Sequence, residues 1–203
     1  MNFWDQQYSS PEYKYGKQAN QFLRNQAVRL HPKSRVLLPG DGEGRNSVWL
    51  AEKGHQVTAL DNSKVGLEKA SKLAMERGVG IEVIEADLAD WVPEAARYEA
   101  IVLTYLHLPP NLRASAHARL ISGLRTGGWF ILEAFHPLQL GMSSGGPKVE
   151  DMLYTSEMIR ADLGQTSQVV MKEVFAWQGQ AQLAEGSGHQ GPAQLTRYVA
   201  QRE

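Results

Sequence analysis

The chain contains a glycine-rich segment with two carboxylates, Gly40-Asp41-Gly42-Glu43-Gly44. A short apolar run, Arg35 to Leu38, precedes it, and a stretch with helical spacing starts at about Arg45. Glycines between a strand and a helix let the backbone approach a ligand closely, where side chains would obstruct it. The segment therefore predicts a site for a nucleotide-like ligand.

The residues within and after this loop separate three kinds of ligand. A Walker phosphate loop ends in Gly-Lys-Ser/Thr, whereas Arg45 and Asn46 follow Gly44 here. A dinucleotide fingerprint places a glycine three residues after its second one, and this chain has Arg45 there. Asp41 and Glu43 would repel a pyrophosphate but attract ammonium and sulfonium groups. The loop therefore favours S-adenosylmethionine over a nicotinamide dinucleotide.

Two more carboxylates follow the next two apolar runs of the chain. Asp61 comes directly after Val57 to Leu60, and Asp87 follows Ile81 to Ile84. Taken singly, either residue is as well explained by capping a helix or closing a turn. In an open parallel sheet, however, both lie at the carboxyl edge, where ligands bind. Asp61 can there accept hydrogen bonds from both ribose hydroxyls.

The segments that must position these residues alternate between short apolar runs and stretches with helical spacing, which indicates an α/β protein. Helices are expected from about Arg45, after the capping residue Ser63, over Leu112 to Leu124 and over Thr155 to Leu163. Strands are expected at Arg35 to Leu38, Val57 to Leu60, Ile81 to Ile84, Ala100 to Leu103, Trp129 to Leu132, Val169 to Trp177 and Leu195 to Ala200. The last two strands are joined across the Gly186, Gly188, Gly191 and Pro192 region. The sequence predicts a Rossmann-like, doubly wound sheet of seven strands, mostly parallel, with a C-terminal antiparallel hairpin.

Composition limits the partners. The 203 residues include 21 Lys plus Arg, 22 Asp plus Glu and no Cys, and the net charge is −1. This balance provides no general attraction for nucleic acid or anionic membranes. Neither an 18-residue apolar run nor a signal peptide is visible, so a cytoplasmic location is expected. The six histidines show no metal-site spacing, and we expect no metal.

We expect one domain over residues 1–203, in three parts. Residues 1–30 form an aromatic N-terminal cap segment, 31–135 a cofactor-binding core, and 136–203 a substrate-side loop with the C-terminal hairpin. Six of the 17 aromatic residues fall in the first 22 positions, Trp4 and Tyr15 among them. That segment is equally well explained as an amphipathic helix on the sheet and as a lid over a ligand.

The chain resembles the class I S-adenosylmethionine-dependent methyltransferases over about residues 1–203. The resemblance rests on the segments 36–46, Val57 to Asp61, Glu85 to Leu88 and Leu124 to Gly128, in that order and at that spacing. Trp4, the Tyr13 to Gly16 segment and the Gly-Arg-Asn end of the loop resemble the branch that contains the tellurite-resistance and thiopurine methyltransferases.

The resemblance implies S-adenosylmethionine as the cofactor and a small-molecule methyl acceptor. It implies that the glycine loop contacts the methionine moiety, Asp61 the ribose, Asp87 the adenine amino group and Leu88 the ring edge. Thr104 and Tyr105 would contact the cofactor after the fourth strand. The full set of expected cofactor-binding residues is Gly40, Asp41, Gly42, Gly44, Arg45, Asn46, Asp61, Asn62, Ala86, Asp87, Leu88, Thr104, Tyr105, Trp4 and Tyr15.

The chain departs from the family pattern at the start of the loop. Members usually have an acidic residue and then an apolar one where this chain has Leu38 and Pro39, and a small residue or Cys in place of Asp41. We expect Asp41 to replace the missing acid by reaching the methionine ammonium from a neighbouring position.

A general base is needed only if the acceptor arrives protonated. His107 and Tyr105, which follow the fourth strand, are the catalytic candidates, although His107 is also explained as a hydrogen-bonded loop residue. Glu133 and His136, at the end of the fifth strand, are the candidate substrate-binding residues. Glu133 is equally well explained by an ion pair with Arg or Lys, and His136 by a turn with Pro137. His189, between glycines, is expected to be exposed.

The sequence thus predicts methyl transfer from S-adenosylmethionine to a small molecule. Two alternatives stay open, a protein that binds the cofactor without catalysis and a nicotinamide-dependent oxidoreductase. The sequence does not identify the acceptor atom or the oligomeric state.

Overall fold

The computed structural model describes residues 2–166 and 168–203. Seven strands form one mixed sheet in the order β3-β2-β1-β4-β5-β7-β6. The strands are β1 (Arg35–Pro39), β2 (Gln56–Asp61), β3 (Glu82–Glu85), β4 (Tyr98–Thr104), β5 (Leu124–Phe135), β6 (Met171–Glu185) and β7 (His189–Arg202). The first five are parallel, and β7 pairs antiparallel with both β5 and β6. The predicted mixed sheet with its C-terminal antiparallel hairpin is confirmed.

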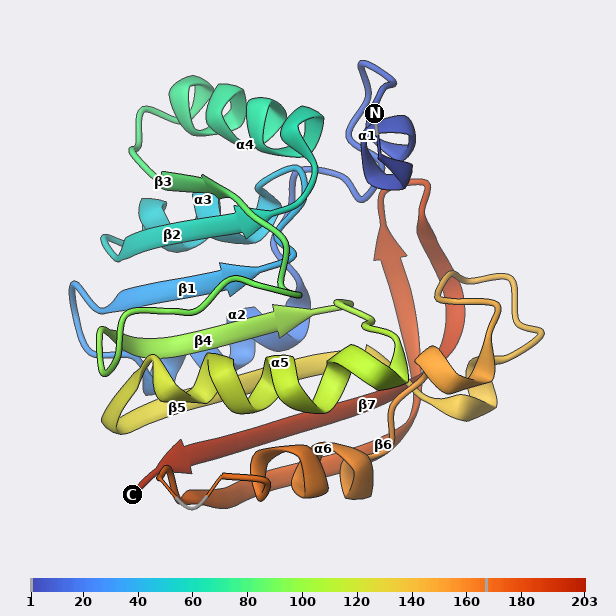
Figure 1. The fold of residues 1–203 in the computed structure, drawn as a ribbon. Helices are drawn as coiled ribbons and strands as arrows, with labels where there is room; N and C mark the ends of the chain where they lie inside the picture. The colour runs from blue at the N-terminus through green and yellow to red at the C-terminus, as the bar shows by residue number, and fades with distance from the viewer. Residues whose placement is uncertain (1, 167) are drawn as a thin grey trace.

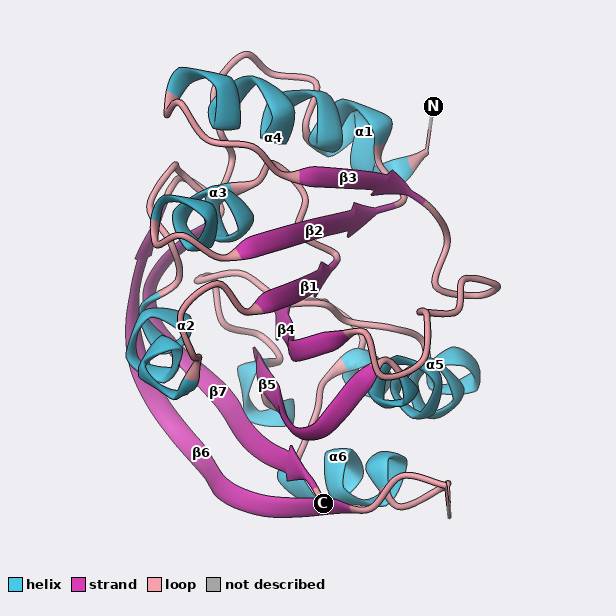
Figure 2. Ribbon diagram, turned by 90° about the vertical axis from the view of Figure 1, so that its left-hand side faces the viewer, coloured by secondary structure: helices cyan, strands magenta, loops and turns pink. Residues whose placement is uncertain are grey.

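Helices cover both faces of the sheet, as Figures 1 and 2 show. They are α1 (Phe3–Gln7), α2 (Gln21–Gln26), α3 (Arg45–Glu52), α4 (Lys64–Glu76), α5 (Pro110–Ser122) and α6 (Ser156–Leu163), with short 3-10 turns η1 (Ala27–Arg29), η2 (Pro137–Gln139) and η3 (Glu150–Met152). The helices α2 and α3 cover one face, α5 and α6 cover the other, and α4 packs beside α3 over the β2–β3 edge. Within the described residues, none of the helices combines the length and apolar composition needed to cross a membrane.

The central strands are apolar because both of their faces are covered. Alternate residues of β4 point to opposite sides: Ile101 and Leu103 pack with α5 and α6, whereas Ala100 and Val102 pack with α2 and α3. All four are buried. This packing fixes the carboxyl ends of β1, β2 and β4 along one edge of the sheet.

The predicted helix over Leu112 to Leu124 begins and ends earlier than expected. It begins at Pro110, where the ring's fixed φ suits the first turn of a helix, and Gly123 caps its end. Leu124 belongs to β5 and pairs with Tyr98, which is a correction to the sequence interpretation.

The C-terminal hairpin is longer than predicted. Both strands extend to the turn at residues 186–188, so Gly191 and Pro192 lie inside β7 rather than in the connection. A strand tolerates proline where one of its edges is unpaired. β5 pairs with β7 from Leu195 onward. Between the hairpin tip and Leu195, which includes Pro192, β7 pairs with β6 alone.

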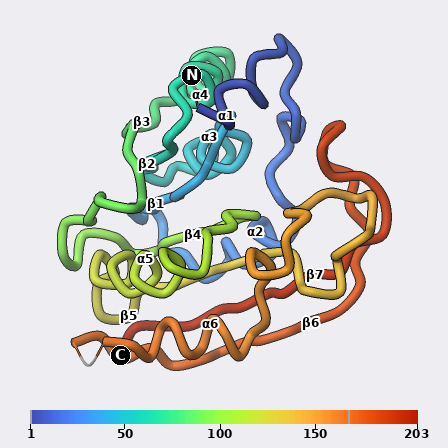
Figure 3. Tube along the Cα trace, turned by 45° about the vertical axis from the view of Figure 1, so that its right-hand side comes forward, coloured from blue at the N-terminus to red at the C-terminus, as the bar shows by residue number. Residues whose placement is uncertain are grey.

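The hairpin bends away from the sheet, and its tip meets the N-terminal segment (Figures 1 and 3). The amide of Gly188 donates to the carbonyl of Lys14 at 2.9 Å. Gly186 packs against the backbone of Gly16, where a Cβ on Gly186 would lie 2.4 Å from the Gly16 nitrogen. We call residues 14–16 and 186–188 the clasp.

Candidate cofactor and acceptor site

The loop between β1 and α3 is a tight turn over the end of β2. Gly40, Gly42 and Gly44 all have positive φ, and the Gly40 amide donates to the Leu60 carbonyl at 2.7 Å. At Gly44, a Cβ would lie 2.5 Å from the Cβ of Ala70 in α4, so only glycine lets α4 approach. The sequence prediction of a glycine loop that opens a helix is confirmed.

Asp61 holds this loop from the end of β2. Its Oδ2 accepts the Gly42 amide at 2.8 Å, and its Oδ1 accepts the Ser63 amide at 2.8 Å. Burial raises its pKa, against the effect of these backbone hydrogen bonds. A carboxylate has about four lone-pair sites, and two are used here. Asp61 can therefore hold the loop and still accept hydrogen bonds from a ligand.

Asp41 has a buried carboxylate oxygen without a hydrogen-bond partner. Its Oδ2 accepts the Ser47 hydroxyl at 2.5 Å, whereas nothing in residues 2–166 and 168–203 bonds its Oδ1. Burial raises its pKa to about 7, and the nearby charge of Asp61 adds to the rise. An unpartnered buried carboxylate is costly unless a cation arrives. Asp41 therefore fits a cationic ligand group.

Glu43, in contrast, is already neutralised. Its Oε1 lies 2.5 Å from the Lys69 Nζ of α4, and both side chains are largely buried. Both negative charges of the loop, Asp41 and Glu43, were expected to repel a pyrophosphate and attract a cationic ligand. Within the described residues, Lys69 neutralises Glu43, and Asp41 alone has no ionic partner.

Arg45 and Asn46 contact other parts of the chain. The Arg45 Nη2 lies 3.0 Å from Glu185 Oε2 at the end of β6, and its Nη1 donates to the Tyr15 carbonyl at 3.5 Å. The Asn46 Oδ1 accepts the Asn20 amide at 2.9 Å. Both residues therefore join α3 to the N-terminal segment and the hairpin.

The predicted adenine side of the site gathers at the ends of β2 and β3. The Ala86 amide donates to the Asp61 carbonyl at 3.0 Å, which places residues 86–88 beside Asp61. Leu88 is buried, whereas Asp87 is exposed and its Oδ1 accepts the Ala89 amide at 2.8 Å. Asn62 is also exposed. The half-buried Ala86 beside the accessible carboxylate of Asp87 suits a flat base with an amino group.

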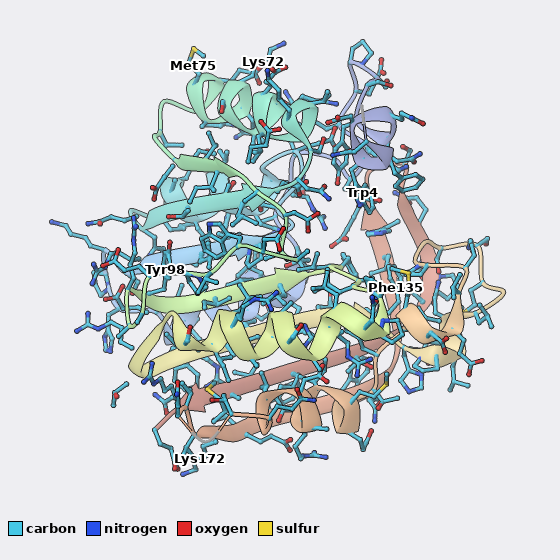
Figure 4. The ribbon with its side chains drawn as sticks, in the orientation of Figure 1. Trp4, Lys72, Met75, Tyr98, Phe135 and Lys172 are labelled. Atoms are coloured by element: carbon cyan, nitrogen blue, oxygen red, sulfur yellow. The ribbon has the colours of Figure 1, made fainter. Side chains whose placement is uncertain are left out.

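The N-terminal segment lies over the glycine loop. Asp5 accepts the Ser63 hydroxyl at 2.8 Å, which attaches α1 to the start of α4. Tyr8 is buried, and a Cβ built on Gly42 would lie 2.6 Å from its hydroxyl oxygen. Trp4 stacks on Tyr8 with ring centroids 5.6 Å apart, and it lies on α1 in Figure 4. The short α1 buries none of its residues, which favours a lid for residues 3–8, whereas Phe22 is buried on α2, which packs on the sheet as the amphipathic helix would.

Tyr105 and Glu133 belong to a buried polar network. The Tyr105 hydroxyl donates to Glu133 Oε1 at 2.7 Å, and the side-chain Nδ2 of Asn20 donates to the same oxygen at 2.6 Å. Arg197 forms an ion pair with Glu133 Oε2. Burial, and then the charge of Glu133, raise the pKa of Tyr105 well above its usual value, so its phenol stays protonated. Of the two explanations for Glu133, the structure shows the ion pair. Thr104 precedes this network at the end of β4.

His107 has no nitrogen available as a base. Its Nδ1 donates to the Met152 carbonyl at 2.5 Å, and its Nε2 accepts the Phe135 amide at 3.1 Å. Burial lowers its pKa to about 4, so the ring is neutral. The structure favours the hydrogen-bonded loop residue over the general base.

His136 caps the turn η2. Its Nδ1 accepts the Leu138 amide at 3.1 Å, directly before Pro137. This geometry matches the turn explanation rather than a substrate contact. The structure thus gives Glu133, His107 and His136 internal partners, and it brings the glycine loop, Asp41, Asp61 and residues 86–88 together.

Sequence reasoning missed three residues of this region. Asn20 connects α2 to Glu133 and Glu185, Tyr8 covers Gly42, and His189 is 4% exposed rather than on the surface. Glycines flank His189 in the chain, but the ring packs against Tyr15 and Tyr105 from distant segments. Local sequence signals do not predict such contacts.

Comparisons with known proteins point to methyltransferases. Residues 36–128 match the model of a methyltransferase domain. A 2-heptyl-1-hydroxyquinolin-4(1H)-one methyltransferase of Mycobacteroides abscessus is 27% identical over 115 residues, 55% of this chain and 51% of that protein. A probable thiol methyltransferase 2 of Arabidopsis thaliana is 27% identical over 137 residues, 66% of this chain and 59% of that protein. The matches thus span little more than half the length of these curated relatives.

The fold is shared more widely. TehB from Haemophilus influenzae superposes with a TM-score of 0.72 over 99% of this chain and 66% of that chain, at 15% identity. At this identity the likeness concerns the fold, including the part of the chain outside residues 36–128.

Proposed function

We propose that the chain is a class I S-adenosylmethionine-dependent methyltransferase and that it transfers a methyl group from S-adenosylmethionine to a small-molecule acceptor, which the match of residues 36–128 to a methyltransferase domain supports. One observation supports this function most directly. Two buried carboxylates, Asp41 and Asp61, meet at the glycine loop, and one oxygen of Asp41 is without a partner there. They match a ligand that is cationic at one end and has ribose hydroxyls in the middle.

The chain's residues have separate tasks in this proposal. When bound, S-adenosylmethionine supplies a methyl carbon already activated by its sulfonium. The Asp41 carboxylate faces the methionine ammonium, Asp61 accepts from the ribose, and residues 86–88 receive the adenine. The acceptor must then be held in line at about 3 to 3.5 Å from the methyl carbon, which provides much of the rate enhancement.

A small acceptor follows from what surrounds the site. The lid, with Trp4 and Tyr8, and the clasp lie over it, so a bulky acceptor has little access. The two curated relatives are named for a hydroxyquinolinone and for thiols, which suggests an oxygen or sulfur acceptor atom.

The nicotinamide alternative is opposed by the geometry. A pyrophosphate would bring negative charge to the buried, unpartnered oxygen of Asp41, and the two would repel each other. The alternative of binding without catalysis makes the same prediction for cofactor affinity, so only a transfer assay separates it from our proposal.

Calorimetric titration with S-adenosylhomocysteine tests the cofactor assignment. We expect micromolar binding to the parent chain, a loss of at least tenfold in Asp61→Ala, and no binding of NAD. Asp90→Ala is the matched control, because Asp90 is an exposed carboxylate after β3 to which no cofactor contact is assigned. Absence of S-adenosylhomocysteine binding at millimolar concentration would refute the proposal. Transfer of labelled methyl to a panel of thiols and phenols then tests catalysis.

A further inference from the structure

His189 lies at the edge of the site with one nitrogen held and the other unused. Its Nδ1 lies 3.2 Å from Glu185 Oε2, directly across the hairpin. Within residues 2–166 and 168–203, the hydrogen bond of the ring runs through Nδ1, and Nε2 takes part in none. A neutral imidazole whose Nδ1–H donates to a carboxylate keeps a lone pair on Nε2.

Glu185 is itself fixed by groups from two other elements. Its Oε2 also lies 3.0 Å from Arg45 Nη2, and its Oε1 accepts from Asn20 Nδ2 at 3.0 Å. Burial opposes the charge, but hydrogen bonds from His189 and Arg45 outweigh it and lower the pKa of Glu185 to about 2. An ionised carboxylate that accepts from Nδ1 selects the Nδ1–H tautomer.

The ring is placed by aromatic neighbours that belong to the site. Its centroid lies 4.4 Å from that of Tyr15, 4.4 Å from that of Tyr105 and 5.1 Å from that of Phe135. Tyr105 follows β4, and Tyr15 touches Tyr8, which covers the glycine loop. Two aromatic contacts, His189 with Tyr15 and Tyr15 with Tyr8, therefore connect His189 to the residue that covers the glycine loop.

The loop at residues 141–148 passes close to this nitrogen without bonding it. A Cβ on Gly145 would lie 2.5 Å from His189 Cδ2 and 3.2 Å from Nε2. The Gly145 backbone therefore packs directly against the edge of the imidazole ring, and a larger residue there would displace the ring. This loop thus packs against the His189 ring.

The other histidines do not offer the same arrangement. Both nitrogens of His107 are engaged, and His136 caps η2. His117 is buried against Asp162 on the far side of the sheet, between α5 and α6. His31 and His55 lie at the amino ends of β1 and β2, away from the ligand edge.

We propose that His189 is the general base of the methyl transfer and that Glu185 positions it; this inference rests on the proposed function. The acceptor's proton passes to His189 Nε2 as the acceptor's lone pair attacks the methyl carbon. The carbon–sulfur bond breaks with its electrons moving to sulfur, which leaves a neutral thioether and an imidazolium that Glu185 stabilises.

Two probes of different acidity test the role. Phenol is protonated at neutral pH and needs a base, whereas 4-nitrothiophenol is ionised and does not. We expect His189→Gln to lower kcat/KM for phenol by about 100-fold or more, the lower end of a general-base contribution, and to change that for 4-nitrothiophenol by less than about threefold. Equal losses for both probes would overturn the proposal, since a role in shape alone affects both. His31→Gln, an exposed histidine, is the matched control.

Nitrogen-15 NMR of the histidines provides a measurement that needs no acceptor. We expect His189 to be the Nδ1–H tautomer, and Glu185→Gln to weaken that preference. An Nε2–H tautomer overturns the proposal, even if neither probe is methylated. Calorimetry with S-adenosylhomocysteine separates failure of the His189 role from failure of the proposed function. We expect His189→Gln to bind this ligand as tightly as the parent chain does. Absence of binding to the parent chain would refute the proposed function itself.

Discussion

The ionisable residues of the site fall into two groups, those that have partners within the chain and those that await a ligand. Glu43, Glu133 and Glu185 are paired with Lys69, Arg197 and Arg45. In the part of the chain that the structure describes, Asp41 is not paired in this way, and one of its oxygens is buried without a hydrogen bond. Such a group destabilises the ligand-free chain and is retained where it contributes to binding.

Asp41 should link cofactor binding to pH. Its pKa of about 7 means that the carboxylate becomes charged as the pH rises through neutrality, and the charged form attracts the ligand's ammonium. We expect S-adenosylhomocysteine to bind more tightly at pH 8 than at pH 6, and Asp41→Asn to bind weakly with little pH dependence. Calorimetry at both pH values measures this. A parent affinity that is flat across this range would contradict the assignment.

The same residue should reduce stability above neutral pH. The folded pKa of Asp41 is raised above its usual 3.8, so the folded state holds a proton that the unfolded state has lost. That contribution to stability is present at low pH and is lost as the pH rises to about 7. Asp41→Asn should therefore have a higher Tm than the parent at pH 8, measured without ligand. A lower Tm would indicate that the carboxylate has a partner after all.

His107 should stabilise the fold rather than take part in proton transfer. Burial holds its pKa at about 4, so the unfolded state binds a proton between about pH 6.5 and 4 that the folded state does not. The stability of the parent chain therefore decreases as the pH is lowered through this window. His107→Gln should cost about 1 to 3 kcal/mol at pH 8 through its lost hydrogen bonds, and less at pH 5, in denaturant titrations. A larger loss at pH 5 than at pH 8 would contradict this role.

At the scale of elements, the sequence predicts β1, β2 and β4 well because each contains a short apolar run between clear turn signals, whereas the start of β5 at Leu124 was missed. It also places Asp61 and the glycine loop, because both lie at strand ends, whose common edge follows from parallel pairing. The length of the β6–β7 hairpin was not predictable in this way. Its outer half packs on the N-terminal segment, about 170 residues away in the chain, and no local pattern reports that contact.

The clasp predicts a test on a single glycine. Gly186 has φ of 57°, and a Cβ there would lie 2.4 Å from both the Gly16 nitrogen and the Lys14 carbonyl oxygen. Gly186→Ala should therefore separate the hairpin tip from residues 14–16 and expose the N-terminal segment to limited proteolysis. Gly80→Ala is the control, because a Cβ at Gly80 meets nothing within 4 Å. Equal cleavage of the two variants would show that the clasp does not hold the segment.

At the scale of the whole molecule, the site is assembled from both ends of the chain. The N-terminal segment covers the loop through Tyr8, and the C-terminal hairpin contributes Glu185 and His189. Arg45 and Asn20 connect the two ends to each other and to the core. Binding at the glycine loop should therefore affect the ends of the chain as well as the strand edge.

Hydrogen exchange measures that coupling directly. Because Tyr8 lies on Gly42 and the clasp ties residues 14–16 to the hairpin tip, a bound S-adenosylhomocysteine should slow amide exchange in three separate segments, 2–16, 40–46 and 185–190. Exchange at residues 110–122 of α5, on the opposite face, reports any global stabilisation and serves as the internal reference. Asp61→Ala should abolish the protection in all three segments together. Protection confined to residues 40–46 would mean that the ends of the chain close over the loop independently of the cofactor.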